Sequence, residues 1–389
     1  MNPITAEVVA AVRSVTGTAA SIPLHTPIIG DVETRFVNEC LESTFVSSVG
    51  PFVSRMEQEI ADVTGARHAI AVSSGTVALQ VALVLAGVQP GDEVVIPSLS
   101  FVATANAVVH AGGVPVFIDS DPVTLGMSVR ALADFLATLT ADGGAPVNPV
   151  SGRRVAAVVP MHTFGHPLEI TSICDLAAAH GIAVVEDAAE SLGSFVDGRH
   201  TGTFGTLGIL SFNGNKIVTT GGGGMILTDD EELGARAKHL TSTAKLPHPW
   251  EFEHDEVAWN YRMPNLNAAL GVAQLSRLPE FLETKREIAR LYAEAFAGVD
   301  GLSFIEEPPG TTSNYWLCSV RLDEPDLAER DRILAALNHD GIQARPFWNL
   351  LSEQRMYRDA QTDGLTEARA LLASVVCLPS SAWLLDRKQ

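Results

Sequence analysis

Residues 155–187 read VAAVVPMHTFGHPLEITSICDLAAAHGIAVVED and give the clearest local indication of the fold class. Two apolar runs, 155–161 and 183–187, lie on either side of a helical pattern at 173–180. A strand with one solvated face alternates apolar and polar residues, whereas a strand covered on both faces is apolar throughout. The stretch therefore predicts two strands of a mainly parallel sheet, with a covering helix between them.

The same alternation extends in both directions, from about residue 69 to residue 228. Further apolar runs predict strands at 69–72, 93–97, 114–119, 208–212 and 223–228. The helical patterns between them lie at 77–85, 102–111 and 132–139. Residues 141–154 are rich in Gly and Pro and are predicted to form a surface loop. Together these segments predict a large α/β sandwich.

The pattern changes after Asp229, where longer amphipathic segments begin. We predict helices at 231–240, 266–278, 281–297 and 328–340, and strands at 315–320 and 375–378. A chain of 389 residues is too long for one small domain. We therefore expect an N-terminal segment (1–30), a large α/β domain (31–279) and a smaller C-terminal α+β domain (280–389).

The charge and composition limit the possible partners. The formal net charge is −20 and the pI is near 4.9, so nucleic acid is an improbable partner. No apolar run reaches the ~18 residues of a membrane span, and no signal-peptide pattern is present, so we expect a cytoplasmic protein without membrane contact. The four Cys lack a CxxC pair, and His162 and His166 lack an HExxH pattern, so no metal site is predicted.

Lys216 is the first candidate for chemistry. Only five of the 26 basic residues are Lys, and Lys216 lies between an apolar strand and the glycine run 221–224. Burying an unpaired ammonium group costs free energy, whereas a Schiff base with an aldehyde cofactor removes this cost. The alternative is a solvated Lys at the rim of a loop. The other lysines fit that alternative, because they lie in charged helical or terminal sequences: Lys238, Lys245, Lys285 and Lys388.

Three further positions follow predicted strands. Asp187 ends a strand, where it could keep a pyridinium nitrogen protonated or simply cap the next helix. Gly75 and Thr76 belong to an SSGT sequence before a helix, which could bind phosphate or form an ordinary N-cap. Phe101 could stack on a cofactor ring or pack in the core. Walker and GxGxxG phosphate motifs are absent from these positions.

The order of these motifs resembles a known enzyme family. SSGT, the aromatic Phe101, EDAAE at 186–190 and SFNGNK at 211–216 are similar to motifs of the fold-type I, pyridoxal 5′-phosphate (PLP)-dependent sugar aminotransferases of the DegT/DnrJ/EryC/StrS family. WNYRMPNLNAA at 259–269 resembles that family's next motif. Within the family, SSVGPFV at 47–53 and MHTFGHP at 161–167 are most similar to the legionaminic-acid and bacillosamine branch.

The resemblance implies roles for the catalytic residues. Lys216 would carry the Schiff base and move the proton, and Asp187 would pair with the pyridinium nitrogen. Glu190 would lie near the ring hydroxyl, although many relatives carry Gln there. Dehydratases of the family have His in place of the Lys, so Lys216 favours transamination.

The resemblance also implies binding roles. Gly75, Thr76 and Ser211 would bind the cofactor phosphate, with Asn213 beside them and Phe101 stacked on the ring. Asn260 and Arg262 would reach the active site of a neighbouring subunit, which implies a homodimer with shared sites. The remaining candidates for contact with substrate are His162, Arg55 and Arg345.

The expected reaction moves an amino group from L-glutamate to C4 of a UDP-linked 4-keto-6-deoxy-N-acetylhexosamine. Such a product would serve lipopolysaccharide or nonulosonic acid biosynthesis. The alternatives are a GDP-perosamine-type 4-aminotransferase and a PLP-dependent sugar dehydratase. A DNA-binding regulator is disfavoured by the net charge of −20.

Overall fold

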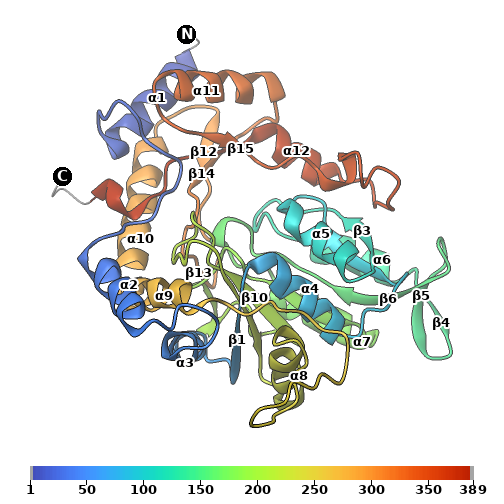
Figure 1. Cartoon of the computed structure of the whole chain (residues 1–389). Coiled ribbons are helices and arrows are strands. Elements are labelled where there is room, and N and C mark those ends of the chain that lie inside the picture. The colour runs from blue at the N-terminus through green and yellow to red at the C-terminus, as the bar shows by residue number, and fades with distance from the viewer. Residues whose placement is uncertain (1–2, 386–389) are drawn as a thin grey trace.

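A nine-stranded sheet lies at the centre of the computed structural model, which describes residues 3–385 (Figure 1). The main path runs β1-β11-β10-β7-β6-β2-β3. β10, β7, β6, β2 and β3 pair in parallel, whereas β11 is antiparallel to both of its neighbours. The strands of this path are β1 (His68–Val72), β2 (Glu93–Pro97), β3 (Val114–Ile118), β6 (Arg153–Val158), β7 (Ala183–Asp187), β10 (Leu207–Ser211) and β11 (Gly224–Thr228).

Both faces of this sheet are buried, which explains the continuous apolar runs. In β11, Ile226 packs on one face, whereas Met225 and Leu227 pack on the other. One face is covered by α4 (Gly75–Leu85), α5 (Val102–His110) and α8 (Glu231–Thr241). The other face is covered by α2 (Asp31–Ser43), α3 (Pro51–Thr64), α6 (Val129–Leu136), α7 (Ile170–Ala179) and α9 (Asn265–Leu275). The predicted mainly parallel α/β sheet is therefore confirmed.

The C-terminal part forms a second, smaller layer. Its antiparallel sheet has the order β12-β14-β16-β15, with β12 at Leu302–Phe304, β14 at Ser319–Leu322, β15 at Arg345–Pro346 and β16 at Val375–Cys377. The helices around it are α10 (Leu278–Phe296), α11 (Leu327–His339) and α12 (Thr366–Ser374). α1 (Pro3–Thr16) packs on α10 and α11 and also contacts the 3-10 helix Ala382–Leu385, so the first and last described helices lie near each other (Figure 1). The domain limits 1–30, 31–279 and 280–389 stay a prediction.

A third, three-stranded sheet links the two parts. In it, β13 (Thr311–Thr312) pairs with β8 (Phe195–Val196), which pairs with β9 (Arg199–His200). Short 3-10 helices lie at Thr163–Gly165, Leu351–Glu353 and Ala382–Leu385. Because β13 follows α10 in the chain and β8 follows β7, this sheet brings the C-terminal part against the edge where β7 ends.

Two sequence-based predictions are wrong. Residues 141–154 form a hairpin of β4 (Thr140–Asp142) and β5 (Ala145–Asn148), which joins the central sheet through β6. β4 is exposed and β5 is largely half-buried, and both strands are short, so they have no apolar run that would reveal them. The predicted strand at 315–320 begins only at Ser319, because Tyr315 has a left-handed φ of 47° that breaks the extended chain.

Candidate active site

A cavity of about 990 Å³ opens beyond the carboxyl ends of β7 and β10. This is the edge at which ligands bind in open α/β sheets. The N-termini of α4 and α5 contribute to its walls, as do segments 23–26 and 343–349 from outside the central sheet. Most of the predicted site residues line it: Gly75, Thr76, Phe101, Asp187, Glu190, Ser211, Asn213, Lys216 and Arg345.

Lys216 lies on the loop between β10 and β11, which folds back on itself. The backbone N–H of Phe212 donates to the carbonyl of Gly223 at 2.9 Å, and the N–H of Thr220 donates to the carbonyl of Phe212 at 2.9 Å. Gly221 takes a φ of 76° in this turn, a conformation that Gly adopts without a steric cost. The glycine run therefore closes the loop, which presents Lys216 at the cavity.

The Lys216 ammonium group has two neighbours. Its Nζ donates to Glu190 Oε1 at 3.1 Å and lies 3.8 Å from the centre of the Trp316 ring. The Lys216 side chain is 13% exposed and that of Glu190 is 1% exposed. The ion pair and the aromatic face therefore stabilise the charged amine in a site that is largely closed to water.

Glu190 is the more perturbed partner of this pair. Burial raises the pKa of its carboxyl from 4.5 to about 7, although Lys216 and the backbone N–H of Phe164 oppose the shift. That N–H donates to Glu190 Oε2 at 2.9 Å. Glu190 can therefore exchange a proton near neutral pH, directly beside the Lys216 amine.

Asp187 lies at the end of β7, on the floor of the cavity. Its Oδ2 accepts a hydrogen bond from Thr104 Oγ1 at 2.8 Å, and its Oδ1 accepts one from the N–H of Ala189 at 3.2 Å. Burial raises the pKa of its carboxyl, and the Thr104 hydrogen bond opposes this shift. A cationic ring nitrogen bound at this carboxylate would supply a positive charge, which would stabilise the ionised form of the buried carboxyl.

The N-terminus of α4 could hold a phosphate group. Ser74 caps the helix by accepting a hydrogen bond from the N–H of Val77, and the first N–H groups, of Gly75 and Thr76, have no intrahelical partner. A Cβ atom on Gly75 would lie 2.9 Å from the Cβ of Ser211. Only Gly therefore lets the helix approach the end of β10 so closely, which gathers three predicted phosphate ligands.

Aromatic side chains border the cavity mouth. Phe101, directly before α5, is 52% exposed and lies with its ring centre 6.2 Å from that of Trp348. An exposed aromatic ring beside a cavity offers a flat face to a bound ring. Arg345 lies near them in β15, and it and Lys216 are the only Arg or Lys side chains among the described lining residues.

Four other predicted residues lie outside the cavity wall. His162 is fully buried, with its Nε2 3.0 Å from Glu186 Oε2 and its Nδ1 accepting from the N–H of Leu168. It also donates its backbone N–H to the carbonyl of Asp187, so any effect on substrate would be indirect. Asn260 is exposed, Arg262 is half-buried, and Arg55 pairs with Glu59 on α3.

Sequence reasoning missed two side chains of the cavity. Trp316 covers the Lys216 amine, and His25 lies against Trp316 with ring centres 6.5 Å apart. Neither ring nitrogen of His25 has a hydrogen-bond partner in residues 3–385, and burial lowers its pKa well below the usual value. Neither residue follows a strand of the central sheet, so no local motif indicates that it belongs to the site.

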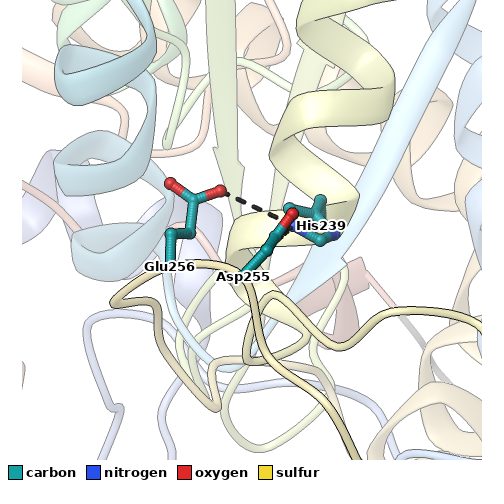
Figure 2. A group of neighbouring side chains, drawn as sticks. All are labelled: His239, Asp255 and Glu256. Atoms are coloured by element: carbon teal, nitrogen blue, oxygen red, sulfur yellow. Dashed lines mark hydrogen bonds and ion pairs between the residues drawn. The ribbon is translucent and has the colours of Figure 1, made fainter.

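One cluster in the described part of the chain has ligands that could suit a metal ion. It consists of His239 at the end of α8 with Asp255 and Glu256 from the following loop (Figure 2). Arg236 forms two hydrogen bonds to Glu256, and His239 Nε2 lies 2.8 Å from Asp255 Oδ1. Glu256 is therefore already paired with a guanidinium group at a surface position, and none of the three residues lines the cavity.

Comparison with known proteins identifies the family. Residues 27–389 match the model of the DegT/DnrJ/EryC1/StrS aminotransferase family. The chain belongs to this family. The predicted family and enzyme class are confirmed, whereas the legionaminic-acid and bacillosamine branch stays a prediction.

Individual relatives match almost the whole chain. EpsN of Bacillus subtilis, assigned as a pyridoxal phosphate-dependent aminotransferase, is 37% identical over 372 residues, which cover 95% of this chain and 93% of EpsN. A GDP-perosamine synthase of Vibrio cholerae is 36% identical over 327 residues, 84% of each chain. The solved aminotransferase TlmJ from Streptoalloteichus hindustanus has a TM-score of 0.84 at 34% identity, covering 92% of this chain and 93% of its own.

The fold-type I architecture and the dependence on PLP are therefore confirmed. The cavity fits this cofactor, because a helix N-terminus, a buried carboxylate and a Lys amine line a single space. Within residues 3–385, no helix combines the length and apolar character needed to cross a membrane.

Proposed function

We propose that this chain is a nucleotide-sugar 4-aminotransferase that moves the amino group of L-glutamate to the keto carbon of a GDP-linked 4-keto-6-deoxyhexose. The observation that carries the reaction class is the Lys216 amine held between Glu190 and Trp316, in the same cavity as Asp187. The choice of GDP rests on the GDP-perosamine synthase from Vibrio cholerae, which is 36% identical. The UDP-linked N-acetyl sugar, expected from motif resemblance, becomes the second candidate.

PLP, when bound, supplies the electron sink of the reaction. The chain's own residues orient it and handle protons. The N–H groups of Gly75 and Thr76, together with Ser211, would hold the phosphate, and Asp187 would keep a proton at the ring nitrogen. Phe101, exposed at the cavity mouth, would shield the cofactor from water.

Lys216 performs the proton transfer in this proposal. Its Nζ would take the α-proton of L-glutamate in the first half-reaction, and would deliver a proton to the sugar carbon that receives the amine in the second. Glu190 lies 3.1 Å from that amine and has a pKa of about 7, so its carboxyl can take a proton from the amine or give one to it during the reaction. Because Trp316 covers the amine, the proton is retained at the reacting atoms and is not lost to solvent.

The nucleotide would bind at the mouth formed by residues 343–349. A diphosphate needs positive charge, and the chain as a whole carries −20, so local groups have to supply the attraction. Arg345 is suited to this because its guanidinium group can bind two phosphate oxygens at once. Trp348 and Phe101 lie beside it and offer aromatic faces to a base or sugar.

We also propose a homodimer in which Asn260 and Arg262 reach the partner's cavity. This is supported by the position of both residues outside the cavity of their own chain. Exposed apolar side chains occur on the same loop, with Trp250 at 75%, Phe252 at 77% and Val257 at 98% exposure. Such a concentration of apolar surface on one loop is typical of an interface. Sedimentation of the holoenzyme tests the dimer, and a monomer at assay concentration would contradict it.

The deciding experiment compares GDP-, UDP- and dTDP-linked 4-keto-6-deoxy sugars with L-glutamate as donor. We expect stoichiometric 2-oxoglutarate and the highest kcat/KM with the GDP sugar, with the amine position established by NMR. Lys216→Ala is the matched control, and borohydride should label Lys216 in the unchanged enzyme only. A preference for the UDP N-acetyl sugar would replace the substrate. Consumption of sugar without 2-oxoglutarate would show a dehydratase.

A further inference from the structure

Lys285 of α10 is fully buried, which contradicts its assignment to the solvated lysines. The residue is 2% exposed and lies on the buried face of α10, with Phe281 and Ile288. Burial lowers the pKa of its amine from 10.5 to about 7, and its printed hydrogen bonds within residues 3–385 go to backbone carbonyls, not to a carboxylate. Burying a Lys lowers the stability of the folded chain, and an apolar residue of similar volume would stabilise it more.

The Lys285 amine ties two irregular segments together. Its Nζ donates to the backbone carbonyl of Trp316 at 3.2 Å, and makes a second, shorter hydrogen bond to the carbonyl of Ser380. Ser380 makes further hydrogen bonds through its side chain and through its backbone N–H. Its Oγ accepts from the N–H of Cys318 at 2.8 Å, and its N–H donates to the carbonyl of Leu24. The Lys285 amine therefore connects the segments around residues 316 and 380 directly, and reaches the segment around residue 24 through Ser380.

Trp316 connects this junction to the active site. Its carbonyl accepts from Lys285, whereas its ring lies 3.8 Å from the Lys216 Nζ. Its indole N–H donates to the carbonyl of Asn215 at 2.7 Å, directly before Lys216 in the chain. The two lysines thus bind opposite ends of one residue, although they are 69 positions apart in sequence.

We propose that Lys285 is a positioning residue for the Lys216 amine: it fixes the backbone of Trp316 and so keeps the indole ring over the Lys216 Nζ. The inference rests on the proposed function only in naming Lys216 as the reacting amine. When the Lys285 anchor is removed, the ring moves away and the ammonium form of Lys216 loses an attractive contact. The pKa of Lys216 then falls.

The test is a double-mutant cycle with Lys285→Met, Trp316→Leu and the double variant. The pKa of Lys216 is measured on the cofactor-free full chain, from the pH dependence of its acylation by acetic anhydride and mass spectrometry of the labelled peptide. The chain has only five lysines, so each is resolved. Lys245→Met, which removes a lysine that contacts Phe252 outside the cavity, is the control.

We expect each single variant to lower the Lys216 pKa by about half a pH unit, the size of a modest cation–π contact. The double variant should shift it no further than Trp316→Leu alone, and Lys245→Met should leave it unchanged.

An unchanged Lys216 pKa in folded Lys285→Met would overturn the proposal, as would a shift that adds in full to that of Trp316→Leu. If the Met variant does not fold, the same cycle is run with Lys285→Gln, whose amide nitrogen lies one bond closer to the backbone and cannot hold the carbonyls of Trp316 and Ser380 together; the same two outcomes overturn the proposal. The labelling needs neither cofactor nor sugar. Failure of the sugar assays would therefore leave this result standing, and failure here would leave the proposed reaction standing.

Discussion

Glu190→Gln should stabilise the cofactor-free chain more strongly as the pH rises from about 5 to about 8. The pKa of the Glu190 carboxyl is about 7 in the folded chain, against an ordinary value of 4.5. Between these values the folded state keeps a proton that the unfolded state has released. The free energy of unfolding of the unchanged chain therefore falls as pH rises through this window, and levels off above pH 7.

The size of the effect follows from the same two values. The interval from 4.5 to about 7 corresponds to about 3 kcal/mol, at about 1.4 kcal/mol per pH unit. The amide that replaces the Glu190 carboxyl cannot titrate, so this pH-dependent loss disappears. Relative to the unchanged chain, the variant should gain about 2 to 3 kcal/mol between pH 5 and pH 8. The Lys216 ion pair needs no separate correction, because its effect on the ionised carboxylate is already contained in the pKa of about 7.

Urea unfolding at one protein concentration, repeated at several pH values, measures this difference. Glu294→Gln is the control, because it removes an exposed carboxyl that pairs with Arg290 at the surface of α10. That variant should follow the unchanged chain. Parallel curves for Glu190→Gln and the unchanged chain would refute the raised pKa, and with it the role of Glu190 in exchanging protons at neutral pH.

Three further predictions follow from the site and its support. Asp187→Asn should slow the single-turnover reaction with L-glutamate at least about a hundredfold, since it removes the charge that holds the ring-nitrogen proton; unchanged turnover would contradict this role. Ser74→Ala should cost about 1 kcal/mol in thermal unfolding and weaken cofactor binding, because it removes the α4 cap; cofactor titration checks the second effect. Gly165→Ala should destabilise the chain by about 1 to 3 kcal/mol or more in urea unfolding, since Gly165 has a φ of 93° and the new Cβ would lie 1.8 Å from Asn314 Oδ1. A neutral result there would show that segment 313–316 adjusts freely.

Much of the site was predictable because its residues follow strands. Asp187 ends β7, Ser211 ends β10, and Gly75 begins the helix after β1. In a sheet that is largely parallel, such positions gather at one edge whatever the surrounding loops do. The order of apolar runs and small residues in the sequence therefore predicts that these three positions lie near one another.

The other part of the site depends on segments far away in the chain. Trp316 and His25 reach the cavity because α10, the small sheets and segment 378–381 hold their backbones there. The burial of Lys285 does have a local signal in the sequence. Phe281, Lys285, Ile288 and Tyr292 are spaced as one face of a helix, and all four are buried. The neighbouring charged residues in the sequence concealed that spacing.

Local patterns in the chain are enough to predict where most buried strands lie, and they single out Lys216 and the acid at the end of β7 as candidates for chemistry, because strand burial and strand-end chemistry are local properties. The packing of distant segments sets which side chains surround the amine and how far each pKa shifts. Those outcomes depend on burial and on distances between segments, and a periodic pattern in one segment carries no information about the residue packed against it.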